Sequence, residues 1–172
     1  LRTAGFASFN QDALTEASKL LSNILMFVGG SSGSTAGGVK TVTMGLVVLS
    51  AVSTMRGRRQ VTVFRRSISQ QDISNAVSVA LLVLGLSLFG AAVLTVCDRC
   101  SFLNAIYETT SALCTVGLTT GITSTLCAAS KLILIVFMFF GRVGIMTIGV
   151  GFMMGDRARE RVQYAETKVM IG

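Results

Sequence analysis

Long apolar stretches alternate with short polar ones along the chain. Four apolar segments stand out, at about 20–55, 73–96, 102–114 and 132–154. An α-helix rises about 1.5 Å per residue, so about 20 residues are needed to cross a bilayer. The second and fourth segments are long enough to span a membrane, whereas the third is too short. The pattern therefore predicts an all-α membrane protein.

Basic residues cluster at 56–66 and again at 157–168, each time beside a long apolar segment. The positive-inside rule places both clusters on the cytoplasmic side. An even number of crossings must then separate them, although three apolar segments lie between. We expect the short segment 102–114 to enter and leave by the outer face. The order predicted is helix, re-entrant pore loop, helix.

The stretch from Thr115 to Gly121 is too polar and too rich in glycine to face lipid. Non-helical backbone is tolerated at membrane depth only where it is buried in protein or lines water. We therefore expect an aqueous space beside this stretch, open to the outside.

The chain contains an internal repeat at an offset of 112 residues (117 − 5). Ten residues recur without a gap, and the run Ala-Ser-Lys-Leu is identical in both copies. The chain then holds one truncated unit that starts at its loop, followed by one complete unit. Since loops that surround a central path number about four, at least two more units are expected upstream or in another subunit. The recurring residues are Thr3, Gly5, Leu14, Ala17, Ser18, Lys19, Leu20, Met26, Phe27 and Gly29, matched by Thr115, Gly117, Leu126, Ala129, Ser130, Lys131, Leu132, Met138, Phe139 and Gly141.

A Thr-x-Gly motif precedes a membrane segment in each copy. A dehydrated cation needs several oxygen ligands, and converging extended loops supply them as rings of backbone carbonyls. Glycine permits the backbone conformation that this arrangement requires. The alternative is that both motifs are ordinary turns that cap helices. The pair at one offset favours a selectivity filter, with K⁺ bound only by the backbone of Thr3, Ala4, Gly5, Phe6, Thr115, Val116, Gly117 and Leu118.

The first apolar segment is interrupted by ten small or polar residues. Each glycine costs about 1 kcal/mol in a helix interior, so we expect the helix to unwind near the middle of the bilayer. A cytoplasmic connector is the alternative, and a phosphate-binding loop is disfavoured because Val39 separates the last glycine from Lys40 and no strand precedes it. The interrupting residues are Gly29, Gly30, Ser31, Ser32, Gly33, Ser34, Thr35, Ala36, Gly37 and Gly38.

Arg142 follows Gly141, which is the repeat partner of Gly29. The second copy, 132–154, is expected to run through without interruption. An arginine near the middle of a membrane is costly and indicates function. We expect the loop 29–38 and Arg142 to form a gate beneath the filter, closed when the loop lies across the path and open when it withdraws.

Composition narrows the function classes. Only 13% of residues are charged, about half the usual ~25%, and the absence of histidine removes the commonest acid-base group and metal ligand, so the chain is not expected to be an enzyme or to hold an organic cofactor. The net charge of +7 lacks the interleaved aromatics of a nucleic-acid site. Cys97 and Cys100 have redox spacing without its usual context, and we interpret them as thiols at a membrane edge or an outward-facing disulfide.

At these motifs the sequence resembles the Trk/Ktr/HKT superfamily of potassium transporters. Residues 2–6 resemble the third filter, 29–40 the intramembrane loop of the third repeat, 115–118 the fourth filter and 140–144 the final pore helix. The terminal stretch 166–172 is similar to the end of Ktr-type membrane subunits.

The resemblance implies potassium uptake, often sodium-stimulated, by a bacterial plasma-membrane protein with four pseudo-repeats, which is a dimer with a cytoplasmic nucleotide-binding (RCK-type) regulatory subunit. The chain would then be a fragment, the final one and a half repeats: the end of the third at 1–55, a cytoplasmic linker at 56–70, the fourth at 71–155 and a cytoplasmic tail at 156–172. A secondary carrier with broken helices or a non-conducting scaffold packed through small residues are the alternatives. Two loops of four do not decide between K⁺ and Na⁺.

Overall fold

The computed structural model describes residues 4–7, 11–31, 37–57, 61–63 and 66–143. The predicted helical class is confirmed with one small departure. The basic linker contains a two-stranded antiparallel pair, in which Thr62 lies opposite Ser67, because the β-branched run at 61–63 favours extended backbone. In chain order the elements are η1 (Gln11–Ala13), α1 (Glu16–Phe27), α2 (Thr41–Met55), β1 (Thr62–Val63), β2 (Arg66–Ser67), α3 (Gln70–Asp98), α4 (Phe102–Leu113), η2 (Ile122–Ser124) and α5 (Ala128–Val143).

Helix α3 has 29 residues and is, among the described residues, the one helix long and apolar enough to cross a membrane. Ser69 caps its first turn, since the Ser69 side chain accepts the Asp72 N–H at 3.2 Å. Large apolar side chains stay exposed along it, among them Leu81 and Phe89. The spanning segment predicted at 73–96 is thus present as a helix, with apolar faces open to lipid or to further protein.

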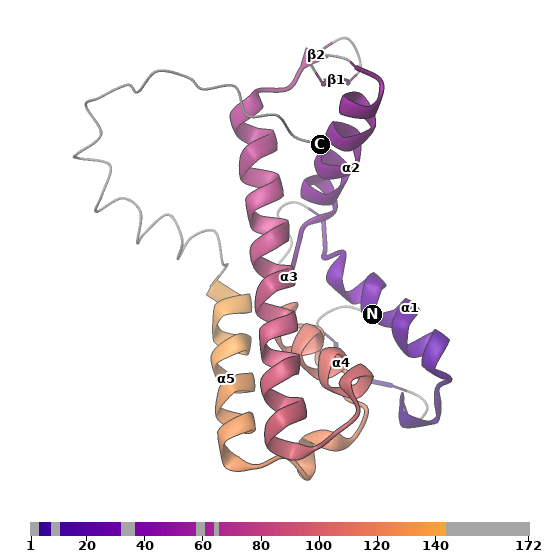
Figure 1. Ribbon diagram of the computed structural model, residues 1–172, viewed down its shortest axis with the longest axis vertical. Coiled ribbons are helices and arrows are strands. Elements are labelled where there is room, and N and C mark those ends of the chain that lie inside the picture. Colours follow the sequence, from indigo (N-terminus) through magenta and orange to yellow (C-terminus); the bar gives the residue numbers. More distant parts are fainter. Residues whose placement is uncertain (1–3, 8–10, 32–36, 58–60, 64–65, 144–172) are drawn as a thin grey trace, which may run out of the picture.

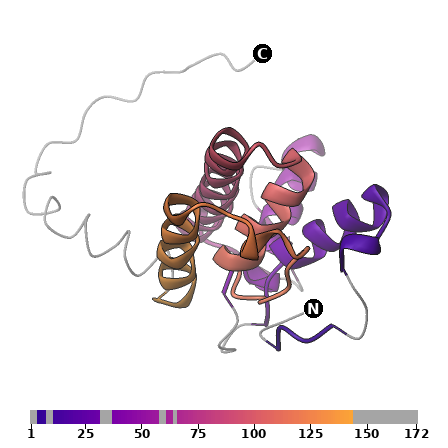
Figure 2. The ribbon, with the colours of Figure 1, turned by 90° about the horizontal axis from the view of Figure 1, so that it is seen from below.

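The short helix α4 lies at the centre of the helices (Figures 1 and 2). It packs against α3, α5 and α1, while α2 packs against the other half of α3. Nearly every residue of its second half is buried, from Tyr107 to Leu113. The main apolar cluster joins α4 to Val83 and Leu94 of α3 and to Phe137 of α5. The side chains on the second half of α4 are therefore held in place by the surrounding helices.

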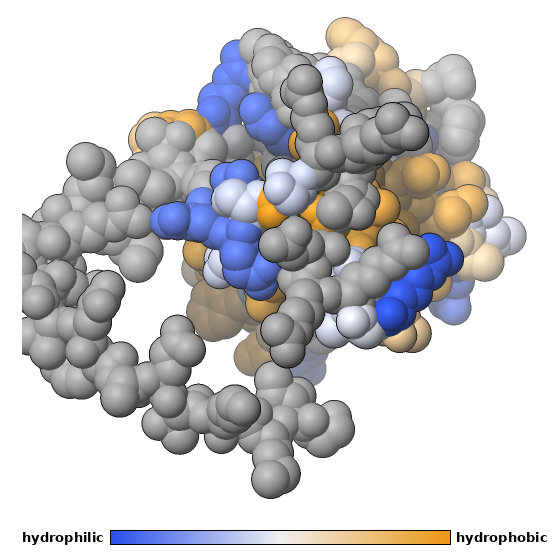
Figure 3. Space-filling view, turned by 90° about the horizontal axis from the view of Figure 1, so that it is seen from above, coloured by the Kyte–Doolittle hydropathy of each residue, from blue (hydrophilic) through white to orange (hydrophobic). Residues whose placement is uncertain are grey.

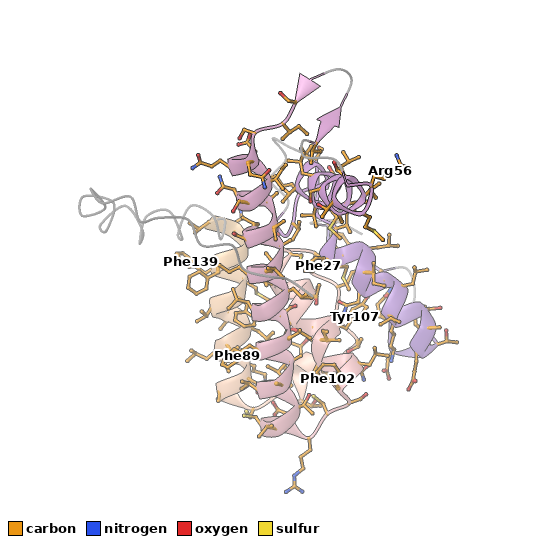
Figure 4. All side chains as sticks on the ribbon, turned by 45° about the horizontal axis from the view of Figure 1, so that its top comes forward. Phe27, Arg56, Phe89, Phe102, Tyr107 and Phe139 are labelled. Carbon is orange, nitrogen blue, oxygen red and sulfur yellow. The ribbon has the colours of Figure 1, made fainter. Side chains whose placement is uncertain are left out.

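The end of the molecule that bears β1 and β2 is more polar than its flanks. Figure 3 views this end and shows several hydrophilic patches with hydrophobic residues beside them. Arg56 lies at this end of α2, and on α5 Phe139 points away from the other helices (Figure 4). A polar end above apolar sides is the distribution that a membrane protein needs at its boundary with water.

Helix α5 is described to Val143, so the predicted continuation of the fourth segment to Met154 and the tail 156–172 lie outside the described residues. The predicted interruption of the first apolar segment is confirmed, because α1 ends at Phe27 and α2 begins at Thr41. Helix α2 is apolar but has 15 residues, short of a full crossing.

Candidate functional site

The chain between α3 and α5 leaves and returns at the same end of α3 (Figure 1). Asp98, the last residue of α3, holds this point closed. Its Oδ1 accepts the backbone N–H of Cys127 at 2.7 Å, and its Oδ2 accepts the hydroxyl of Ser130 at 2.5 Å. Helix α4 and the loop after it therefore form a hairpin that reaches part of the way along α3, which is the path that a re-entrant segment takes.

The returning segment of this hairpin, 115–120, has no regular secondary structure, and its buried and exposed residues alternate. The side chains of Val116, Leu118 and Thr120 are buried, while Gly117 and Thr119 between them are exposed. The end of α4 fixes the segment, because the Ser111 carbonyl accepts the Val116 N–H at 2.9 Å and the Ser111 hydroxyl donates to the Leu118 carbonyl at 2.6 Å. One face is thus anchored in the core and the other is free to meet a ligand.

The two glycine motifs meet face to face. Gly5 has a φ of +64° and Gly117 a φ of +84°, a conformation that side chains disfavour. A Cβ placed on Gly5 would lie 3.1 Å from the Gly117 carbonyl oxygen, and one placed on Gly117 would lie 3.1 Å from the Gly5 Cα. Ala4 and Phe6, on either side of Gly5, are exposed. Thr3 lies outside the described residues.

The repeat found in the sequence extends to the structure. Helices α1 and α5 begin at residues 16 and 128, an offset of 112 (128 − 16), and a short 3-10 helix precedes each. Lys19 donates to the Asp12 carboxylate at 3.2 Å, and its partner Lys131 donates to the Ser124 carbonyl at 3.2 Å. Asp12 and Ser124 are themselves 112 residues apart (124 − 12). Both units therefore tie the loop after the glycine to the following helix in the same way.

The glycine-rich break between α1 and α2 is pinned at its base. The Gly29 N–H donates to the Val39 carbonyl at 2.6 Å, and the Thr41 N–H donates to the Gly30 carbonyl at 3.0 Å. These bonds satisfy polar backbone that a broken helix would otherwise leave unpaired. Residues 32–36 of the predicted loop lie outside the described residues.

The returning end of this break touches both the second glycine motif and α5. The Gly37 N–H donates to the Thr115 hydroxyl at 2.8 Å. A Cβ on Gly37 would lie 2.9 Å from the Gly141 carbonyl oxygen, one residue before Arg142. The break, the glycine motif at 115–118 and the region of Arg142 are thus brought together by the fold, as the repeat had indicated from their matching depth.

A cavity of about 610 Å³ lies among these parts. It is bounded by both glycine motifs, by one side of α4, by the loop after Gly117 and by α5. Arg142 and Glu108 contribute its charged side chains. The lining residues are Ala4, Gly5, Glu108, Ser111, Ala112, Thr115, Val116, Gly117, Leu118, Thr119, Thr123, Leu134, Met138 and Arg142.

Sequence reasoning gave Glu108 and Tyr107 no role. Glu108 is only 5% exposed, and its carboxylate accepts hydrogen bonds from Thr119, Thr120 and Thr123. The Tyr107 side chain is also buried, and its hydroxyl donates to Gln11 of η1 at 3.0 Å. A signal was present, since an acidic residue inside a short apolar helix must find donors, and the three threonines that donate to Glu108 all lie within 15 residues of it (123 − 108).

Cys97 and Cys100 carry separate thiols. Cys97 is exposed, whereas burial raises the pKa of the Cys100 thiol above its ordinary value. Within the described ranges no group of three or more potential ligands could hold a metal ion.

Comparison with known proteins gives consistent matches over the whole chain. A family model described as TrkH, a cation transport protein, matches residues 1–159. The chain is 36% identical over 171 residues to the Ktr system potassium uptake protein B of Bacillus subtilis, covering 99% of this chain and 38% of that protein. It is 35% identical over 176 residues to the potassium/sodium uptake protein NtpJ of Enterococcus hirae, covering 99% and 39%, and 30% identical over 171 residues to the Ktr system potassium uptake protein B of Vibrio alginolyticus, covering 99% and 37%. The chain thus spans less than two fifths of the length of these relatives.

Proposed function

This chain belongs to the TrkH family of cation transport proteins, and we propose from that premise that it forms the C-terminal part of a Ktr-type potassium-uptake subunit. Its two glycine motifs would supply half of a carbonyl-lined filter, at Thr3–Phe6 and Thr115–Leu118, with the Leu118 carbonyl turned toward α4, where it accepts the Ser111 hydroxyl. The observation that carries the proposal is the contact between Gly5 and Gly117, both with left-handed backbone, at the wall of one cavity.

Two loops in contact cannot enclose an ion. Figure 2 looks from below toward the end where the α4–α5 loop lies, and α4 with this loop lies between α5 and α1. Exposed apolar residues on the outer sides of α1 and α5, such as Leu21 and Ile135, leave surface for further helices or lipid. We therefore assign the missing half of the filter to two further repeats of the same protein, in a multi-pass subunit of the bacterial plasma membrane.

We place the proposed gate directly beneath the proposed filter. Gly37 touches Thr115 on one side and Gly141 on the other, so the break 29–38 would cross the ion path next to Arg142. A guanidinium is always charged, and a positive charge beside a low-dielectric path repels a cation strongly. Withdrawal of the loop from Thr115 would open the path.

The proposed ion is K⁺, with Na⁺ as a stimulating or competing ion, and the proposed partners are a second copy of the subunit and a cytoplasmic nucleotide-binding (RCK-type) regulatory ring. The proposed ions follow the family and its relatives, which are named as potassium and potassium/sodium uptake proteins. The proposed partners follow the likeness to proteins of the Ktr system. They are properties of the full-length protein, of which this chain is one part.

Growth of a potassium-uptake-deficient bacterium at low K⁺ tests the proposal. The full-length protein that contains this chain should restore growth, and Gly117→Ser should abolish the rescue because its side chain meets Gly5 in a disfavoured conformation. Gly121→Ser is the matched control, since Gly121 also has a positive φ but has open space around its Cβ position. Equal rescue by Gly117→Ser would contradict the filter assignment, and flux coupled stoichiometrically to a second solute would indicate a carrier.

The gate has its own test. Arg142→Ala should raise K⁺ flux through the full-length protein when uptake is otherwise low, because the charge that opposes the cation is gone. Arg142→Lys keeps the charge and should stay close to the parent. Unchanged flux in Arg142→Ala, with normal abundance in the membrane, would remove Arg142 from the gate.

A further inference from the structure

We propose that Glu108 and Ser111 are positioning residues that fix the outer half of the second filter loop and so set how strictly the pore distinguishes K⁺ from Na⁺. The proposal deepens the function proposed above and rests on it. Glu108 and Ser111 lie one helical turn apart on α4, on the side that faces the cavity. Neither supplies an oxygen to the ion in this assignment, and both act through the backbone of the loop.

Glu108 accepts hydrogen bonds from the loop that follows the proposed filter. Its Oε1 accepts the Thr119 hydroxyl at 2.5 Å, the Thr120 N–H at 2.9 Å and the Thr120 hydroxyl at 3.2 Å. Its Oε2 accepts the Thr123 hydroxyl at 3.1 Å. An ionised carboxylate is the side-chain group that only accepts hydrogen bonds and has room for four. One buried carboxylate thus fixes the positions of Thr119, Thr120 and Thr123.

Ser111 holds the filter segment itself. Its hydroxyl turns the Leu118 carbonyl toward α4, and its own carbonyl takes the Val116 N–H. The residues on both sides of Gly117 are therefore anchored to the same turn of α4. With Glu108 holding the chain from Thr119 onward, the direction of the Gly117 carbonyl follows from the position of α4.

The same helix face also reaches the first repeat. Asn104, Tyr107, Glu108 and Ser111 follow the i, i+3, i+4, i+7 spacing of one helix stripe. Asn104 accepts from Lys19 at 3.2 Å and Tyr107 donates to Gln11. Lys19 and Gln11 both follow the first glycine motif in the chain. Helix α4 therefore links the segments that follow the two proposed filter loops.

Anchoring of this kind affects function through the positions of the filter carbonyls. K⁺ and Na⁺ carry the same charge and differ in size, so discrimination depends on how the coordinating carbonyls are held and on their field strength. A loop released from its anchors can move its carbonyls toward the smaller ion. A merely stabilising pair would change the amount of folded protein and leave the ratio of the two ions unaltered.

The test compares K⁺ and Na⁺ uptake by the full-length protein in proteoliposomes, at matched protein content. Glu108→Gln keeps the side-chain volume but removes the charge that strengthens four hydrogen bonds, and Ser111→Ala removes the hydroxyl on the Leu118 carbonyl. We expect Glu108→Gln to lower the K⁺ to Na⁺ uptake ratio by about tenfold, the factor that one lost charge-assisted bond represents, and Ser111→Ala to lower it by about fivefold, the factor for one neutral bond. Thr123→Ala should give a smaller decrease, since it removes one of the four bonds.

Thr125→Ala is the matched control, because the Thr125 hydroxyl donates to the nearby Ile122 carbonyl in the same loop and, among the described residues, makes no bond to α4. It should leave the ratio unchanged. An unaltered ratio in Glu108→Gln and Ser111→Ala, with K⁺ uptake still measurable, would overturn the inference while leaving the proposed function intact. A higher K⁺ concentration for half-maximal uptake with an unaltered ratio would also overturn it, since that result makes Glu108 a cation-attracting group. If the unsubstituted protein carried no K⁺, the proposed function itself would fail.

Discussion

Thr115 occupies the junction between the two functions assigned to this chain. Its backbone is left-handed, with a φ of +54°, which is uncommon for a β-branched residue. Its hydroxyl accepts the Gly37 N–H from the broken helix, while its own N–H donates to the Ala112 carbonyl at 3.2 Å. In the proposed function, one residue thus belongs to the filter through its backbone and to the gate through its side chain.

Thr115→Val should therefore loosen the gate. Valine has the same shape as threonine but offers no acceptor, so the Gly37 N–H loses its partner in the closed arrangement. A hydrogen bond contributes about 1 kcal/mol net, or roughly a fivefold change in an equilibrium. K⁺ uptake by the full-length protein under closed conditions should rise by about that factor, measured as ion flux per molecule.

Thr115→Ser is the comparison, because it retains the hydroxyl and should keep the parent flux. If valine and serine raised the flux equally, loss of the hydrogen bond would not be the cause, because serine retains the hydroxyl that accepts the Gly37 N–H. A fall in flux with valine would place the Gly37 contact in the open state instead.

At the scale of elements, the contact between α3 and α5 decides whether the hairpin that contains α4 stays in place. Gly90 of α3 faces the Phe137 ring so closely that a Cβ there would overlap it, and the Thr109 methyl lies 3.0 Å from the same point. Gly85, on the same helix, has nothing within 4 Å of its Cβ position. The two glycines are therefore a matched pair within one helix.

Gly90→Ala should destabilise the protein by about 1–3 kcal/mol, the usual cost of overpacking a filled site. Gly85→Ala should be neutral or stabilising by up to about 1 kcal/mol, because it replaces a glycine in a helix interior. The thermal denaturation midpoint of the purified full-length protein in detergent measures both. Equal midpoints for the two variants would mean that α3 and α5 are not packed as described.

At the scale of the whole molecule, the ends of α3 carry different chemistry. Gly57 and the basic linker lie at one end, and Cys97 lies at the other with its thiol exposed. The positive-inside rule assigns the first end to the cytoplasm. The hairpin closed by Asp98 would then open on the outer face.

A membrane-impermeant maleimide checks this orientation in intact cells. In variants that retain a single cysteine, Cys97 should be labelled from outside, whereas Gly57→Cys, placed in a chain that lacks Cys97, Cys100, Cys114 and Cys127, should be labelled only after the cells are opened. Cys100 should react more slowly than Cys97, because only the thiolate is nucleophilic and burial raises the pKa of the Cys100 thiol. Labelling of Gly57→Cys from outside would reverse the topology and contradict the proposed uptake path.

Patterns that depend on local composition could be predicted from the sequence. The length of α3, the break after Phe27 and the short helix before Thr115 follow from apolar runs and glycine content. The convergence of Gly5 and Gly117 was indicated by the repeat. The anchors Asp98 and Tyr107 were missed because their partners are distant in sequence, 29 and 32 residues for Asp98 and 96 residues for Tyr107 and Gln11. Glu108 was missed although its partners lie within 15 residues. Which donor satisfies a buried polar group is fixed by tertiary packing, which a hydropathy pattern does not contain.

The contact between Gly5 and Gly117 also makes the two positions interdependent in variation. A methyl group at either glycine pushes against the backbone of the other, so the first substitution already separates the loops that the second would separate. The loss of stability in the double variant should therefore be smaller than the sum of the losses in the two single variants, as expected for residues in direct contact. The residue tolerated at one of these glycines should thus depend on the residue at the other, so the two copies of the repeat should vary together at the point where they touch.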